Sequence, residues 1–209
     1  MKALDVETPT GPARAQLDLA DEACAALVLG HGAGGGVEAP DLSAAATAAR
    51  SQGISVALVE QPYRVAGRRS PARAPQLDAA WVAVLRSLSR GELAGLPLVI
   101  GGRSLGARVA CRTAQATGAV GVLCLAFPLE PPRRSAKPPQ SRLAELEAVD
   151  VPVLVVQGDR DPFGMPPPGP LRQVVMVRGD HGLKADLGAV AEAVRVWLAE
   201  VVPAAAALR

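Results

Sequence analysis

The sequence has very few aromatic residues: two tryptophans, two phenylalanines and one tyrosine among 209 residues. Its three cysteines lack CxxC or metal-ligand spacing, so neither a disulfide framework nor a zinc site is expected, and buried thiols are the better interpretation. No apolar run is long enough to span a bilayer, and the charged N-terminal segment lacks the apolar core of a signal peptide. We therefore expect a cytoplasmic protein without a membrane partner.

The charge pattern argues against a nucleic-acid binder. The net charge is +2, and the arginines are spread along the chain apart from a cluster at Arg64, Arg68, Arg69 and Arg73. Because a polynucleotide partner requires a broad basic face, none is expected. The cluster is interpreted as a solvated loop, with attraction of an anionic substrate or partner as the alternative.

The apolar content, 49% of the residues, is sufficient for one substantial core. We expect one domain over residues 1–209, ending in a frayed helix end at 203–209. Short β-branched runs alternate with helical patterns, which is typical of an α/β fold with a mostly parallel sheet and helices on both faces. The expected strands are residues 25–29, 54–59, 98–101, 120–125, 153–157 and 173–177.

Other patterns predict the remaining elements. Apolar residues recur at helical spacing over 77–88 and 187–201, and both stretches are expected to lie on the sheet. Gly53 and Gly118 stand where two further helices are expected to end. The opening segment, from Val6 to Leu17, is expected to add an antiparallel hairpin at the sheet edge. The sheet should then have about six to eight strands.

A GxSxG motif, Gly102 to Gly106, lies between an expected strand and an expected helix. At such a turn a serine projects from the sheet edge, and the crowded backbone leaves no room for Cβ atoms two positions to either side. Ser104 is therefore the candidate nucleophile. The N–H of Leu105, at the start of the helix, favours an oxyanion there. The alternative is a glycine-rich turn that serine merely caps.

A second glycine-rich loop, His31-Gly-Ala-Gly-Gly-Gly, follows the first buried strand. It can bring backbone N–H groups close to a reacting carbonyl, with Ala33 or Gly34 as the second oxyanion donor. A nucleotide-phosphate loop fits badly, because neither GxxxxGK[ST] nor GxGxxG spacing is present. His31 is interpreted as a hydrogen-bonding residue of this loop rather than as a base.

Candidate acid and base residues follow two later strands. His181 comes after the last expected strand, and Asp161 after the strand at 153–157. Both therefore belong to the carboxyl edge of the sheet, onto which Ser104 also opens, and the chain order Ser, Asp, His is that of α/β-hydrolases. Asp159 is expected to brace its own turn, and Asp180 to cap a loop or face solvent.

Five segments in order carry a family resemblance: HGAGGG, GGRSLGARVA, FPLEPP, QGDRDPFG and DHGLK. Together, over roughly Leu27 to Lys184, they resemble the small α/β-hydrolase family that contains testis-expressed protein thirty and a subunit of the NSL chromatin complex. The resemblance implies an α/β-hydrolase fold and the roles given above for Ser104, Asp161 and His181. No insertion of lid length is visible, which argues against a bulky lipid substrate.

The expected function is hydrolysis of a small ester, thioester or related acyl bond through an acyl-enzyme, with a small-molecule acyl substrate and no metal or organic cofactor. Tyr63, Phe127 and Phe163 either line a small apolar pocket or anchor loops. Two alternatives stay open. The fold could be a non-catalytic binding or scaffolding module that docks through the Pro- and Arg-rich segment 128–140, or it could pass the acyl group to an acceptor other than water.

Overall fold

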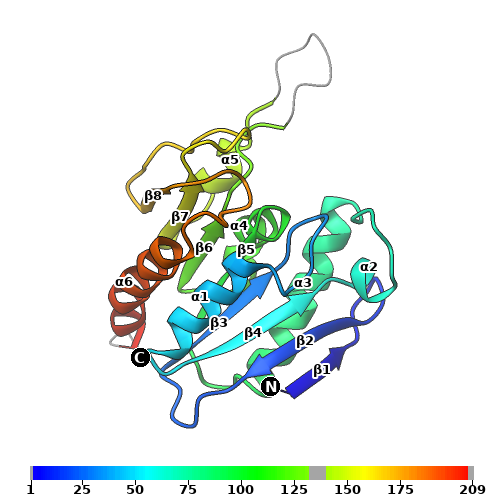
Figure 1. The fold of residues 1–209 in the computed structure, drawn as a ribbon. Helices are drawn as coiled ribbons and strands as arrows, with labels where there is room; N and C mark the ends of the chain where they lie inside the picture. The colour runs from blue at the N-terminus through cyan, green and yellow to red at the C-terminus, as the bar shows by residue number, and fades with distance from the viewer. Residues whose placement is uncertain (1, 132–139, 207–209) are drawn as a thin grey trace.

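The computed structural model describes residues 2–131 and 140–206. The predicted loop at 128–140 and the predicted frayed tail at 203–209 thus lie partly outside the described residues. Within them the sheet has eight strands in the order β1-β2-β4-β3-β5-β6-β7-β8 (Figure 1). The strands are β1 (Lys2–Val6), β2 (Ala13–Asp18), β3 (Ala25–Gly30), β4 (Ile54–Glu60), β5 (Leu98–Arg103), β6 (Gly121–Leu125), β7 (Val153–Gly158) and β8 (Arg172–Val177).

The predicted fold class is confirmed. All six predicted strands are present, and β3 to β8 are parallel where they pair with one another. The predicted hairpin is present as β1 and β2, which pair antiparallel with each other, and β2 pairs antiparallel with β4. Strands β3, β6 and β7 are buried along their whole length, as expected for parallel strands covered on both faces.

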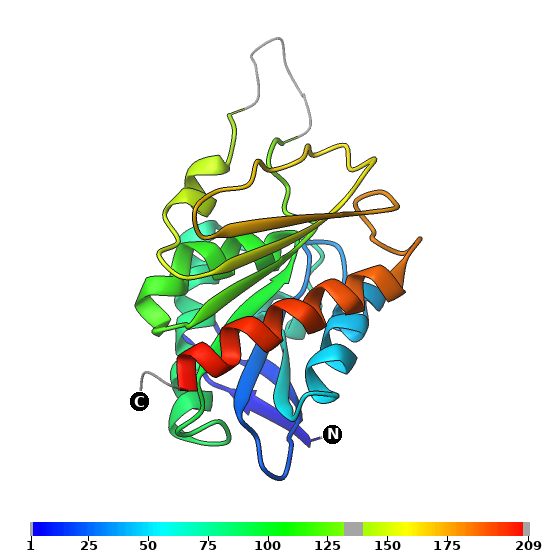
Figure 2. The ribbon, with the colours of Figure 1, turned by 90° about the vertical axis from the view of Figure 1, so that its left-hand side faces the viewer.

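Helices cover both faces of the sheet. Their bounds are α1 (Pro40–Arg50), α2 (Pro62–Val65), α3 (Ala74–Arg90), α4 (Leu105–Thr117), α5 (Leu143–Glu147) and α6 (Leu187–Ala206). Helices α1 and α6 lie side by side over one face (Figure 2), where Leu42 and Trp197 join its core. Helices α3, α4 and α5 cover the other face, around Trp81 and Val109.

Helix ends agree with the sequence in part. Gly118 caps α4 in the left-handed conformation, at φ 63°, as predicted. Gly53 has φ 71° but lies two residues beyond Ser51, the cap of α1, so it shapes the following turn. The last helix continues through Ala206, so part of the predicted frayed tail is helical.

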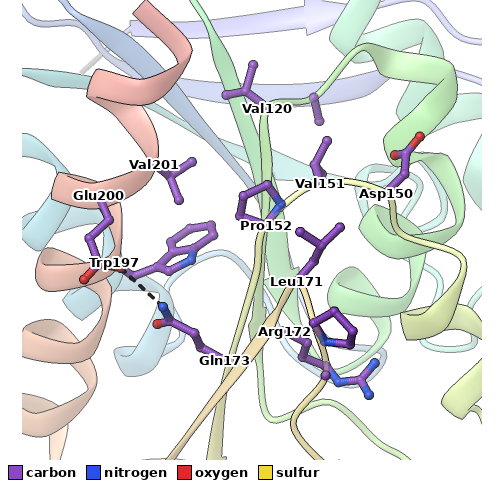
Figure 3. Close-up of a pocket in the computed structure, with 13 residues that line it drawn as sticks. Val120, Asp150, Val151, Pro152, Leu171, Arg172, Gln173, Trp197, Glu200 and Val201 are labelled. Carbon is purple, nitrogen blue, oxygen red and sulfur yellow. Dashed lines mark hydrogen bonds between the residues drawn. The ribbon is translucent and has the colours of Figure 1, made fainter.

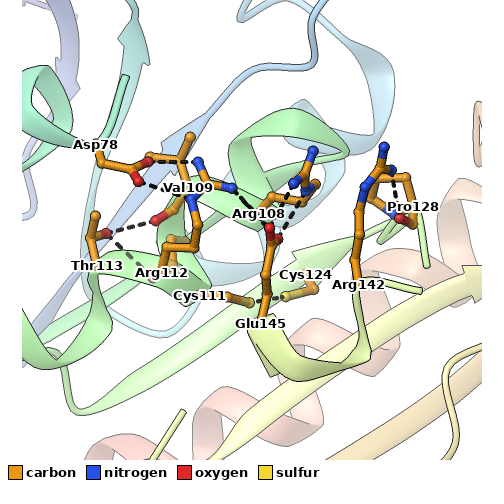
Figure 4. A network of polar contacts seen from close by, with 11 residues as sticks. Asp78, Arg108, Val109, Cys111, Arg112, Thr113, Cys124, Pro128, Arg142 and Glu145 are labelled. Atoms are coloured by element: carbon orange, nitrogen blue, oxygen red, sulfur yellow. Dashed lines mark hydrogen bonds and ion pairs between the residues drawn. The ribbon is translucent and has the colours of Figure 1, made fainter. Parts of the chain in front are cut away.

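Ion pairs fix the helix that begins at the GxSxG motif. On α4, Arg112 pairs with Asp78 of α3 and Arg108 pairs with Glu145 of α5, each at 2.6 Å (Figure 4). These pairs are partly buried and place α4 between its two neighbours.

Two of the three cysteines, Cys111 and Cys124, have buried thiols, as predicted. Cys24 is exposed, against the prediction, because it precedes the start of β3.

Candidate active site

The turn between β5 and α4 is sharply strained at one residue. Ser104 has φ 52° and ψ −102°, a conformation that costs a non-glycine residue on the order of 1–3 kcal/mol. Its N–H donates to the carbonyl of Leu125 at 2.9 Å. A Cβ atom on either Gly102 or Gly106 would lie 2.3 Å from the carbonyl oxygen of Gly30. The two glycines thus let the turn pack against the end of β3, as the motif predicts.

The structure brings Ser104, His181 and Asp161 into one hydrogen-bonded chain. The Nε2 atom of His181 lies 2.9 Å from the Ser104 Oγ, and its Nδ1 lies 2.8 Å from the Asp161 Oδ2. An ionised carboxylate is an acceptor, so Nδ1–H donates to Asp161 and Nε2 is free to accept the serine proton. The side chain of His181 is 20% exposed and that of Asp161 is 1% exposed. A partly exposed imidazole is therefore backed by a buried carboxylate.

A residue that sequence analysis missed helps to orient the carboxylate. Gln157, fully buried at the end of β7, donates from Nε2 to the Asp161 Oδ2 at 2.8 Å and to the carbonyls of Phe127 and Gly164. The N–H of Phe163 donates to the Asp161 Oδ1 at 2.9 Å. The signal in the sequence is a polar side chain that ends an otherwise apolar strand.

The other two candidate carboxylates lie on the same loops. The prediction that Asp159 braces its own turn is wrong. Its Oδ1 instead accepts the N–H of Gly179, at 2.8 Å, on the loop after β8. Asp180 caps its own loop by accepting the N–H of Gly182, as expected. Asp159 therefore ties the acid loop to the base loop, while Asp161 contacts the imidazole.

The glycine-rich loop after β3 lies against the nucleophile. A Cβ atom built on Gly32 would be 3.7 Å from the Cβ of Ser104. Within the described residues, the N–H groups of Ala33, Gly34 and Leu105 have no acceptor, which suits them to an incoming oxyanion.

The ring of His31 makes two hydrogen bonds that fix the start of this loop. Its Nδ1 lies 2.8 Å from the carbonyl of Gly32, and its Nε2 accepts the N–H of Gln61 at 3.1 Å. Burial lowers the pKa of His31, which favours the neutral ring that these two bonds require. The predicted structural role of His31 agrees with this geometry.

The three candidate pocket aromatics have different positions. Phe127 is fully buried in the core, so the prediction that its ring lines a substrate pocket is wrong. The ring turns inward because the chain after β6 is still covered by neighbouring elements. Tyr63 is 5% exposed and donates its hydroxyl to the carbonyl of Ala33 at 3.1 Å, so it anchors the loop. The ring centre of Phe163 lies 4.4 Å from that of His181, where a substrate could touch it.

Two cavities lie at opposite edges of the sheet. One, of about 420 Å³, adjoins the proposed oxyanion loop and the base loop; its lining includes Gly34, Arg103 and Gly182. A larger one, of about 690 Å³, lies at the opposite edge, where Trp197 and Val201 point from α6 toward Pro152 (Figure 3). None of the predicted site residues lines the larger cavity. Among the described residues no cluster of His, Cys, Asp and Glu is arranged to hold a metal ion.

Comparison with known proteins identifies the family. Residues 23–187 match the family described as the alpha/beta hydrolase domain, so the chain belongs to the α/β-hydrolase family. No curated protein matches the sequence. No helix among the described residues is long and apolar enough to cross a membrane.

Similar solved structures share the fold. One is a serine hydrolase without a lid from Xanthomonas campestris, at 22% identity over 94% of each chain and a TM-score of 0.71. Another is Est1E from Butyrivibrio proteoclasticus, at 15% identity over 97% of this chain and 100% of that chain, with a TM-score of 0.77. A third is dienelactone hydrolase from Anabaena variabilis, at 16% identity over 96% of this chain and 97% of that chain, with a TM-score of 0.75.

Proposed function

We propose that the protein is a serine hydrolase that cleaves a small ester, thioester or related acyl bond. The observation that carries the proposal is the unbroken hydrogen-bonded chain of 2.9 and 2.8 Å from Ser104 through His181 to Asp161. The resemblance to the small family of testis-expressed protein thirty supports the same roles. Two of the structural neighbours, a serine hydrolase without a lid and a dienelactone hydrolase, fit the same reaction class.

The geometry suits acyl transfer to water. His181 Nε2 takes the proton as the Ser104 Oγ attacks the substrate carbonyl, and Asp161 keeps the imidazole in the required tautomer. The N–H groups of Leu105 and of Ala33 or Gly34 stabilise the oxyanion. His181 then protonates the leaving group, and water, activated by the same imidazole, releases the acyl group from the serine.

The cavity beside the oxyanion loop supports a small, polar substrate. Its lining is mainly glycine backbone and charged side chains, with Glu38, Arg103 and Lys184 among them. A long aliphatic chain gains free energy by burying apolar surface against apolar walls, at about 25 cal/mol per Å². This lining offers little such surface, so we expect short acyl groups to be preferred.

Labelling with a fluorophosphonate probe tests the proposal. The wild type should be labelled, and Ser104→Ala and His181→Ala should not, because the probe reacts with an activated serine. Ser87→Ala, which removes an exposed serine of α3, is the matched control and should be labelled like the wild type. Acetate, butyrate and octanoate esters and thioesters then test the chain-length preference.

A purified wild type that resists the probe would contradict the proposal, including its small-molecule acyl substrate. It would favour the alternative of a non-catalytic binding or scaffolding module. Labelling without release of a free acid would point to transfer to another acceptor. A preference for octanoate over acetate would overturn the inference drawn from the polar cavity.

A further inference from the structure

Arg103, the last residue of β5, joins three parts of the candidate site. It directly precedes Ser104, and its side chain reaches two other segments. Its Nη2 donates to the backbone carbonyl of His181 at 2.8 Å, and its Nε lies 2.9 Å from the Oδ2 of Asp41 in the first turn of α1. One guanidinium thus connects the nucleophile turn, the start of α1 and the loop that carries the base.

Asp41 is suited to anchor that guanidinium. Its side chain is fully buried, whereas that of Arg103 is 19% exposed. The Asp41 Oδ1 accepts the N–H of Leu42 at 3.0 Å. Its Oδ2 has no hydrogen bond of good geometry among the described residues, and the charge it faces is that of Arg103, at 2.9 Å. Burial raises the pKa of Asp41 and the charge of Arg103 opposes that rise. Because a guanidinium is a rigid planar fork, fixing Nε also fixes the direction of Nη2.

The base loop needs such a support. Residues 178–186 form neither helix nor strand. Asp159 holds Gly179, and Asp161 holds the imidazole of His181, but Arg103 binds the backbone of His181 itself. Arg103 Nη1 also lies under the oxyanion loop, since a Cβ atom on Gly32 would be 2.9 Å from it.

We propose that Arg103, anchored by Asp41, is a positioning residue that keeps the imidazole of His181 within reach of the Ser104 hydroxyl. This inference rests on the proposed function, since it assigns His181 the role of base. Arg103 itself contacts neither the reacting bond nor the proton that passes from Ser104 to His181.

Steady-state hydrolysis of a short nitrophenyl ester gives the first test. In Arg103→Ala, kcat should fall about 100-fold with KM little changed, because a displacement of about 1 Å at reacting groups costs a factor of that size. Added guanidinium ion should restore part of the lost kcat. The kcat of Arg103→Lys should lie between those of the wild type and Arg103→Ala. An ammonium keeps the charge but cannot bridge Asp41 and the His181 carbonyl in one plane.

Two further variants separate positioning from folding. Arg103→Ala leaves Asp41 buried without its counter-charge, which can unfold the protein, whereas Arg103→Ala with Asp41→Asn removes both charges. The double variant should lose no more kcat than Arg103→Ala, because both substitutions break one support. Arg195→Ala is the control, since it breaks an exposed ion pair with Glu192 and should change neither kcat nor its response to guanidinium.

An NMR measurement decides the question without catalysis. The chain has two histidines, so labelling histidine with nitrogen-15 yields two imidazole signals. The Nδ1–H signal of His181 should broaden or shift in the double variant and stay in place in Arg195→Ala. An unchanged His181 signal, or a folded Arg103→Ala with wild-type kcat, would overturn the positioning role. A wild type that fails to react with the fluorophosphonate would instead refute the proposed function, and the NMR comparison would still test the support of His181.

Discussion

Replacing Gly106 with alanine tests how closely the nucleophile turn packs on the sheet. The new Cβ atom would lie 2.3 Å from the Gly30 oxygen and 2.6 Å from its carbon, closer than any real Cβ contact. Both neighbours are backbone at the end of β3, so relief requires α4 or the strand end to move by close to an ångström. Overpacking of this kind costs about 1–3 kcal/mol, and backbone neighbours place this site at the upper end.

The cost converts to a measurable shift in thermal stability. For a chain of this length 1 kcal/mol corresponds to about 2–4 °C in Tm, so about 3 kcal/mol lowers Tm by about 6–12 °C. Differential scanning calorimetry measures the shift, and the rate of fluorophosphonate labelling should fall as well, because β3 also carries the oxyanion loop. Gly188→Ala is the control: its Cβ would meet a single atom at 3.7 Å, and alanine favours the helix. Equal Tm values for Gly106→Ala and Gly188→Ala would refute this account of the turn.

Three further predictions concern the acid and the two histidines. Asp161→Asn should lower kcat about 10⁴-fold in ester hydrolysis, the loss that a wrong imidazole tautomer produces in a serine protease. Gln157→Leu should cost about 1.5–3 kcal/mol of unfolding free energy in urea titrations, the range for a hydrogen bond to a charged group. Because the folded-state pKa of His31 is lowered, the unfolded chain binds more protons, so stability from the neutral ring is full above about pH 6.5 and decreases below it. Urea titrations at pH 7.5 and 5.5 should show this loss in the wild type and in His181→Ala but not in His31→Asn.

The sheet was predictable from the sequence because its strands have distinct local signals. β3, β5 and β7 each begin with an apolar run and lead into glycine-rich or charged loops, the pattern of strands buried on both faces. The GxSxG motif predicted the strained turn at Ser104 because its two glycines meet a steric demand set by the fold itself. Strand order, in contrast, depends on pairing between distant segments, and no local pattern contains it.

The supports of the site were not predictable in the same way. Arg103 and Asp41 are 62 positions apart, by their numbers, and meet because β5 and α1 converge at one edge of the sheet. Phe127 has the composition of a pocket residue, but its burial is decided by the elements packed around the end of β6. Asp159 and Asp161 are chemically identical and two residues apart, so the direction of each side chain along the turn decides which one meets the imidazole.

Gly158, in the QGDRDPFG segment, is another glycine that a close backbone approach requires. A Cβ atom there would lie 2.5 Å from the carbonyl of Asp180 and 2.6 Å from that of Gly179, the same kind of close approach that makes Gly102 necessary. Gly158 serves one contact, between the end of β7 and the loop after β8. That contact lets the loop that carries Asp161 pack against the loop that carries His181, and the two side chains lie 2.8 Å apart. The acid–base geometry thus depends on a missing side chain at the end of a strand as much as on the carboxylate and the imidazole.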